Sequence, residues 1–147
     1  MLIDHLQDDL RQAQLQRDEV KVSVLRMLIS EVKYAQIAKG EELSDQDIIS
    51  VISREVKKRR EGAAGFRQGG REEDAQKEEA EAQILLSYLP SQLADEELTK
   101  IIEEAIKKVG AFSVADMGKV MSEVMGKTAG RAEGARVSAL VKEKLLS

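Results

Sequence analysis

The chain has 147 residues, of which 42% are hydrophobic, 34% charged and 3% aromatic, with a formal net charge of −4. It has no cysteine, which excludes a disulfide framework, a thiolate zinc site and a cysteine nucleophile. A single proline and few aromatic residues argue against a β-sandwich or barrel, whereas abundant Ala, Glu, Lys, Leu and Arg favour helices. Composition therefore predicts an all-α protein. No apolar stretch is long enough to span a membrane and no signal peptide is recognisable, so we expect a cytoplasmic protein without membrane contact.

Apolar residues recur every three or four positions along the first 90 residues, the spacing of amphipathic helices. Ser44 begins a capping pattern, the segment Gly62–Gly65 is expected to loosen its helix, and Pro90 ends the last helix of this part. The second helix has the widest apolar face and is the expected centre of the core. We predict a four-helix N-terminal domain over residues 1–90, with helices at 2–16, 18–40, 44–70 and 71–88.

The remaining residues, 91–147, predict a small three-helix tail domain. Its first helix starts with an acidic turn at Asp95 and closes at Gly110. A capping pattern at Ser113 opens a second, short helix, and the sequence GKTAGRAEG (126–134) is expected to form a loop before the last helix.

Charge is distributed unevenly along the chain. Residues 1–90 hold 14 basic and 18 acidic side chains, whereas residues 107–147 hold eight basic and four acidic ones. A basic run at 54–60 lies inside the acidic part. This run fits a solvated helix with internal ion pairs as well as it fits a site for an anionic partner.

The segment 126–134 carries the sharpest local signal for ligand binding. Three glycines four residues apart allow close backbone approach, and Lys127 and Arg131 add charge ahead of a helix N-terminus, which attracts phosphate. An equally good interpretation is that Gly126 and Gly130 only end one helix and turn the chain. The residues alone leave both interpretations open.

Catalytic chemistry finds little support in the sequence. His5 is the only histidine, so one chain cannot build a catalytic triad or a histidine-rich metal site. The acidic run between Glu72 and Glu81 is typical of a solvated helix face and lacks the Glu-x-x-His pairs of di-iron bundles. We predict no catalytic residue, no metal ligand and no cofactor.

Three stretches, taken together, resemble the YqeY family of small bacterial proteins: the opening helices, REVKKRREGAAGFRQGGREEDAQKEEAEAQILLSYLPSQL (54–93) and VADMGKVMSEVMGKTAGRAEGARVSALV (114–141). That family is similar to the C-terminal helical and tail regions of the B subunit of glutamyl-tRNA(Gln)/aspartyl-tRNA(Asn) amidotransferase. The resemblance implies a helical N-terminal part and a helical tail domain, which in the amidotransferase contacts tRNA. It also implies the label of a carbon–nitrogen ligase with glutamine as amido donor. The chain has no counterpart of the subunit's large catalytic domain, and it has Glu133-Gly134 where the tail often has Asp-Pro.

We therefore predict a non-catalytic accessory protein whose tail binds structured RNA, above all tRNA. Scarce aromatic residues argue for recognition of backbone and shape rather than base stacking. Further expected partners are an aminoacyl-tRNA synthetase or amidotransferase subunits. The alternatives are a subunit that supports ligase activity and a helical adaptor that binds only proteins. The predicted RNA-binding residues are Lys119, Lys127, Arg131, Arg136 and Lys142.

Overall fold

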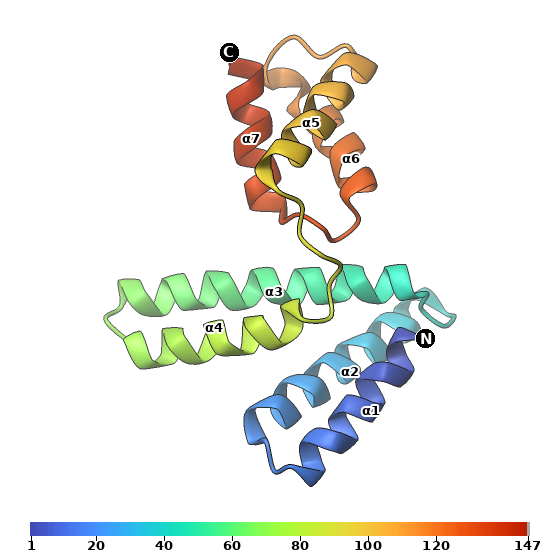
Figure 1. Cartoon of the computed structure of the whole chain (residues 1–147), viewed down its shortest axis with the longest axis vertical. Helices are drawn as coiled ribbons and strands as arrows, with labels where there is room; N and C mark the ends of the chain where they lie inside the picture. Colours follow the sequence, from blue (N-terminus) through green and yellow to red (C-terminus); the bar gives the residue numbers. More distant parts are fainter. Residues whose placement is uncertain (147) are drawn as a thin grey trace. The chain divides into compact units, whose positions relative to one another are not determined.

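The computed structural model describes residues 1–146, and these residues form seven α-helices, one short 3₁₀ helix and no strand (Figure 1). The prediction of an all-α protein with four helices followed by three is confirmed. The chain divides into two compact units, Met1–Leu89 and the residues from Pro90 onward, here called the N-terminal unit and the tail unit. The N-terminal unit holds α1 (Leu2–Leu15), α2 (Glu19–Lys39), α3 (Asp45–Gln68) and α4 (Glu72–Leu86). The tail unit holds α5 (Asp95–Val109), η1 (Val114–Asp116), α6 (Met117–Thr128) and α7 (Gly134–Leu146).

Helix α2 lies at the centre of the N-terminal unit, as its wide apolar face predicts. It packs against α1, α3 and α4 and supplies five buried apolar side chains to one core. Both ends of α2 are set by residues next to the helix. The side chain of Asp18 accepts a hydrogen bond from the N–H of Lys21, and Gly40 closes the helix in the left-handed conformation with φ of 80°. Ser44 and Asp47 then form the reciprocal capping box of α3.

Helix α3 was expected to loosen at Gly62–Gly65, and this expectation is wrong. The helix continues without a break through these residues to Gln68. Ala63 is only 2% exposed, and Gly62 faces the side chain of Glu78 on α4. Small residues let the two helices approach closely, so tertiary packing outweighs the weak helix propensity of glycine. The hairpin turns at Gly69-Gly70, where the sequence places the end of the helix.

The tail unit has its own core, built from α5, α6 and α7. Gly110 ends α5 in the left-handed conformation, and Ser113 and Asp116 form a capping box around η1. The loop expected over 126–134 is shorter than predicted, because α6 extends through Thr128, whose side chain is fully buried. The turn is made by Ala129 and Gly130, both with positive φ, so Gly126 does not end the helix.

None of the helices in the described part of the chain is both long and apolar enough to cross a membrane.

Candidate nucleic-acid interface

Two exposed lysines of α5 and α6 pair with one glutamate of α6, and a third exposed lysine lies on the same face of α6. Lys119, Glu123 and Lys127 are spaced four residues apart and therefore share one face of α6. The Glu123 carboxylate accepts a hydrogen bond from Nζ of Lys108, near the end of α5, at 2.8 Å, and it lies 3.7 Å from Nζ of Lys127. We call Lys108, Lys119 and Lys127 the lysine face.

The electrostatics of the lysine face leave an excess of positive charge. The hydrogen bond from Lys108, followed by the charges of Lys108 and Lys127, holds the pKa of Glu123 below its ordinary value, so this carboxylate is ionised at neutral pH. Three ammonium groups lie near two carboxylates, Glu123 and the Asp116 that Lys119 acts on, which leaves a net charge of +1. Because the lysine side chains are solvent-exposed, they can exchange water for the phosphates of a polyanion.

Two other predicted RNA-binding residues, Arg131 and Arg136, hold the segment that precedes α5. Nε of Arg131 donates to the carbonyl of Ser91 at 3.2 Å, and its own carbonyl accepts from the N–H of Leu93 at 2.8 Å. Arg136 donates to the carbonyl of Leu93 at 2.5 Å and to the carboxylate of Asp95 at 2.8 Å. These contacts span about 40 residues of sequence, so local patterns could not reveal them. The geometry gives both arginines a structural task.

The last predicted residue, Lys142, is exposed on α7 and has no hydrogen bond or ion pair to the residues that the structure describes. Its neighbour Lys144 pairs with Glu103 of α5 at 2.9 Å, which lowers the pKa of Glu103. Acidic residues of α5 thus pair with two of the three basic residues of α7, because Arg136 binds Asp95 in the same way. Counted from residue 91, the tail holds nine basic and nine acidic residues. The tail is therefore neutral as a whole, and its excess positive charge is local, as on the lysine face.

Lys108, the third member of that face, was not among the residues predicted from the sequence. The only sequence signal for it was the pair Lys107-Lys108 in the last turn of α5, where cations complement the helix dipole. That signal predicts a stable helix end but does not show that Lys108 and α6 lie together.

The basic run at 54–60 on α3 is largely neutralised inside the N-terminal unit. Arg59 pairs with Glu78 at 3.5 Å and, at closer range, with Glu81, a buried residue of α4. Lys57 and Lys58 pair with glutamates of their own helix. Of the two interpretations open from the sequence, these contacts favour an ion-paired helix.

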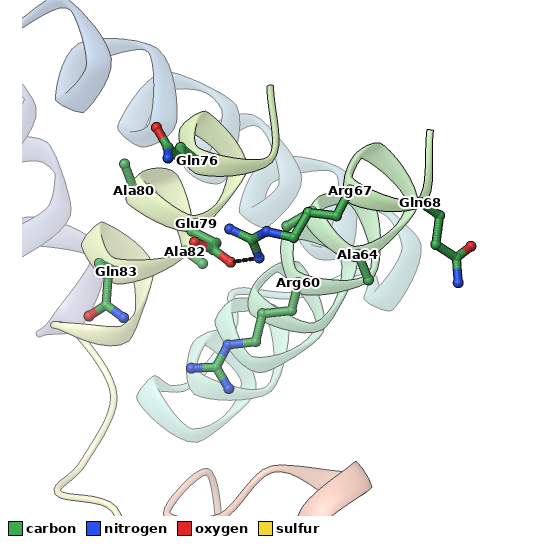
Figure 2. Close-up of a pocket in the computed structure, with 10 residues that line it drawn as sticks. Arg60, Ala64, Arg67, Gln68, Gln76, Glu79, Ala80, Ala82 and Gln83 are labelled. Carbon is green, nitrogen blue, oxygen red and sulfur yellow. Dashed lines mark hydrogen bonds and ion pairs between the residues drawn. The ribbon is translucent and has the colours of Figure 1, made fainter. Parts of the chain in front are cut away.

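A groove lies between α3 and α4 of the same unit, and its lining combines alanines with charged and amide side chains (Figure 2). Arg67 reaches across the groove to Glu79 and also binds Glu72. The hydrogen bond from Arg67 lowers the pKa of Glu79. The other lining residues are alanines, glutamines and Arg60. No group of three or more His, Asp or Glu side chains within residues 1–146 could hold a metal ion. The groove offers hydrogen-bonding groups, and its one carboxylate is already paired.

His5, the only histidine, joins a small surface cluster that the sequence did not predict. The hydroxyl of Tyr88 donates to the carboxylate of Asp9 at 2.5 Å, and Nε2 of His5 lies 3.5 Å from the same oxygen. Burial, followed by the contact with Asp9, raises the pKa of Tyr88 well above its ordinary value. The phenol thus remains a hydrogen-bond donor at neutral pH and ties the end of α4 to α1.

Comparison with known proteins defines the class of this helical protein. The model of the YqeY-like protein family matches residues 3–145, so the chain belongs to that family. Curated relatives include a protein of Eremothecium gossypii named "Altered inheritance of mitochondria protein 41, mitochondrial", 33% identical over 58% of this chain and 47% of its own length. Proteins of the same name from Vanderwaltozyma polyspora and Saccharomyces cerevisiae are 27% and 24% identical, over 76% and 81% of this chain and 64% and 68% of their own lengths.

The chain therefore spans from about half to two thirds of the length of these relatives. The sequence resemblance pointed to a family of bacterial proteins, whereas these curated relatives are fungal and carry a mitochondrial name. The expected cytoplasmic location stays a prediction for this chain.

Proposed function

We propose that this protein is a non-catalytic accessory protein that binds structured RNA, and tRNA in particular, through its tail unit. The observation that supports this most strongly is the lysine face, where two exposed ammonium groups share a single carboxylate and a third lysine lies on the same helix face. Phosphate contacts of this kind supply affinity without reading sequence. The resemblance to the tRNA-contacting tail of the amidotransferase B subunit supports tRNA as the RNA class.

The proposal assigns different tasks to the five predicted residues. Lys119 and Lys127 contact phosphates directly, together with Lys108. Arg131 and Arg136 keep the segment before α5 in place, and their side chains already donate to protein oxygens. Lys142 adds charge at a distance from these phosphate contacts and contributes less to affinity.

The test measures binding of tRNA to the full chain over a series of salt concentrations. Lys119→Ala/Lys127→Ala removes two phosphate contacts, so the slope of log K against log salt should become shallower by about 1.5. The matched control is Lys33→Ala/Lys77→Ala, which removes the same charge from two exposed lysines of the N-terminal unit. The control should keep the wild-type slope.

Equal slopes for the wild type and the tail variant would contradict the lysine face as the RNA site. Absence of tRNA binding even at low salt would contradict RNA binding altogether. The proposal that the protein is not a catalyst has a separate test, in which the protein is incubated with Glu-tRNA(Gln), glutamine and ATP. Formation of Gln-tRNA without other subunits would show that the protein is catalytic.

A second candidate function, a protein-binding helical adaptor, rests on the outer surface of α2. Tyr34 is 68% exposed and Ile37 is 78% exposed, and they are three residues apart on one helix face. Exposed apolar side chains of this kind occur at protein interfaces. An adaptor that binds only proteins retains no RNA at any salt concentration, so the same titration separates the two functions.

A further inference from the structure

Phe112 is the most exposed large apolar side chain of the described residues, with 91% of its surface open to solvent. It lies between the end of α5 and the start of η1. The only other phenylalanine, Phe66, lies against the guanidinium of Arg71 and is half-buried. An aromatic ring left in water gains nothing for folding, and its surface is open to contact with a partner.

The backbone that carries Phe112 is held firmly. Its N–H donates to the carboxylate of Asp116 at 2.9 Å, and the N–H of Ser113 donates to the same oxygen at 3.4 Å. The capping box of Ser113 and Asp116 and the left-handed Gly110 fix the chain on both sides. These two backbone N–H groups, with a smaller effect from Lys119, lower the pKa of Asp116 and keep it ionised. The ring is thus displayed on an ordered turn.

Lysines lie near the turn that carries the ring. Lys119 lies close enough to Asp116 to act on its carboxylate, the same group that holds Phe112. Lys107 and Lys108 occupy the last turn of α5, shortly before Phe112 in the chain. Asp116 is the one carboxylate among these groups, and it accepts hydrogen bonds from the two backbone N–H groups of the turn.

We propose that Phe112 stacks on an unpaired base of the bound RNA while the lysine face holds the neighbouring phosphates. This inference rests on the proposed RNA-binding function and names the part of the RNA that the tail recognises. An unpaired nucleotide offers a flat π surface and a phosphate together, which complements an exposed ring beside ammonium groups. An apolar protein surface would complement the ring but would leave the lysines without anions. The scarcity of aromatic residues argues against stacking on many bases, but one exposed ring is enough to stack on a single base.

The experiment compares Phe112→Leu with wild type on two RNAs, tRNA and a blunt, fully paired RNA duplex. Leucine keeps an apolar side chain but has no π surface. Phe112→Leu should weaken tRNA binding by about tenfold. It should leave the salt slope unchanged, because no phosphate contact is lost, and it should not alter binding to the duplex.

A second variant gives a direct signal of stacking. The chain has no tryptophan, so Phe112→Trp introduces a single one at the site. Tryptophan should retain wild-type affinity, and its fluorescence should be quenched by tRNA but not by the duplex. This variant also serves as the conservative rescue of Phe112→Leu.

The outcomes separate this inference from the function on which it rests. If tRNA binding depends on Lys119 and Lys127 but Phe112→Leu binds as tightly as wild type, the stacking inference is wrong and the RNA site stands. Equal weakening on tRNA and duplex, or no quenching of Phe112→Trp by tRNA, would also overturn stacking. If the wild type binds no RNA at low salt, both proposals fail. Self-association of the wild type that Phe112→Leu abolishes, without an effect on tRNA, would assign the ring to a protein interface.

Discussion

The two units use their basic residues in opposite ways. In the N-terminal unit, cations of α3 face glutamates across the helix hairpin, as Arg59 does with Glu78 and Glu81. In the tail unit, Lys108 and Lys127 share the single carboxylate of Glu123, and Lys119 lies on the same face. The run at 54–60 is the denser basic segment in sequence, yet Lys57, Lys58 and Arg59 each pair with different glutamates, whereas two lysines of the tail share one. Basic residues suggest a site for an anion only where the fold does not supply the anion itself.

The largest expected effects come from the separate cores of the two units. Leu28 in the N-terminal unit and Ile102 in the tail unit are fully buried in different clusters. Each substitution by alanine should destabilise its own unit by about 2–5 kcal/mol, because it removes packing and leaves a cavity. Amide hydrogen exchange on the full chain should show reduced protection in α1–α4 for Leu28→Ala and in α5–α7 for Ile102→Ala. Equal loss of protection in both units from either substitution would contradict two separate cores.

The next effect tests the ion pairs of the hairpin. Arg59→Ala leaves the buried carboxylate of Glu81 without its closest partner, which should lower the free energy of unfolding by about 3 kcal/mol. The control Arg54→Ala removes an exposed arginine of the same helix and should change stability by less than about 0.5 kcal/mol. Urea unfolding followed by the near-ultraviolet signal of Tyr34 and Tyr88 reports on this unit, because both tyrosines of the chain lie in it. Similar effects of the two variants would show that the pairing contributes little.

A smaller effect distinguishes the two kinds of cation within the tail. Arg136→Ala loses hydrogen bonds to Leu93 and Asp95 and should destabilise the tail unit by about 1–2 kcal/mol. It should leave the salt slope of tRNA binding unchanged. Lys127→Ala should do the reverse, with little loss of stability and a shallower slope. A slope that falls for Arg136→Ala would place this arginine on the RNA instead.

The smallest expected effect is a pH dependence from Asp116. Its pKa is below the ordinary value of 3.8, chiefly because it accepts hydrogen bonds from the N–H groups of Phe112 and Ser113. The contribution of the Asp116 carboxylate to stability is therefore fully present above pH 3.8, and it is lost as the pH falls through the lowered pKa of the folded state. Asp116→Ala should reduce the melting temperature of the tail at pH 7, and the difference from wild type should shrink to zero in stronger acid. A difference that persists unchanged in acid would show that the carboxylate charge is not responsible.

Local chemistry made much of the fold predictable. The caps at Ser44 and Gly110 act through residues within one turn, so the sequence reveals them directly. The extension of α3 through Gly62–Gly65 and of α6 through Thr128 could not be predicted from local propensity, because burial against other helices decides both.

The candidate site was predictable only in part. Lys119 and Lys127 were both predicted to bind RNA, but Lys127 was expected in a loop, so the helix face that they share was not foreseen. The structural tasks of Arg131 and Arg136 depend on partners about 40 residues away, and the position of Lys108 beside α6 depends on how two helices pack. Phe112 lies in the turn before η1, outside any apolar repeat of the helices. This position in the sequence indicates that the side chain is exposed, but it does not indicate what the side chain binds.

The most direct test of the central claim, that the tail binds RNA through the lysine face, is an amide chemical-shift map of the full chain titrated with tRNA. The account predicts shifts that cluster on α6 and the end of α5, around Lys108, Lys119 and Lys127, and that fade as salt is raised. Shifts confined to the basic run at 54–60, or no shifts at low salt, would contradict it.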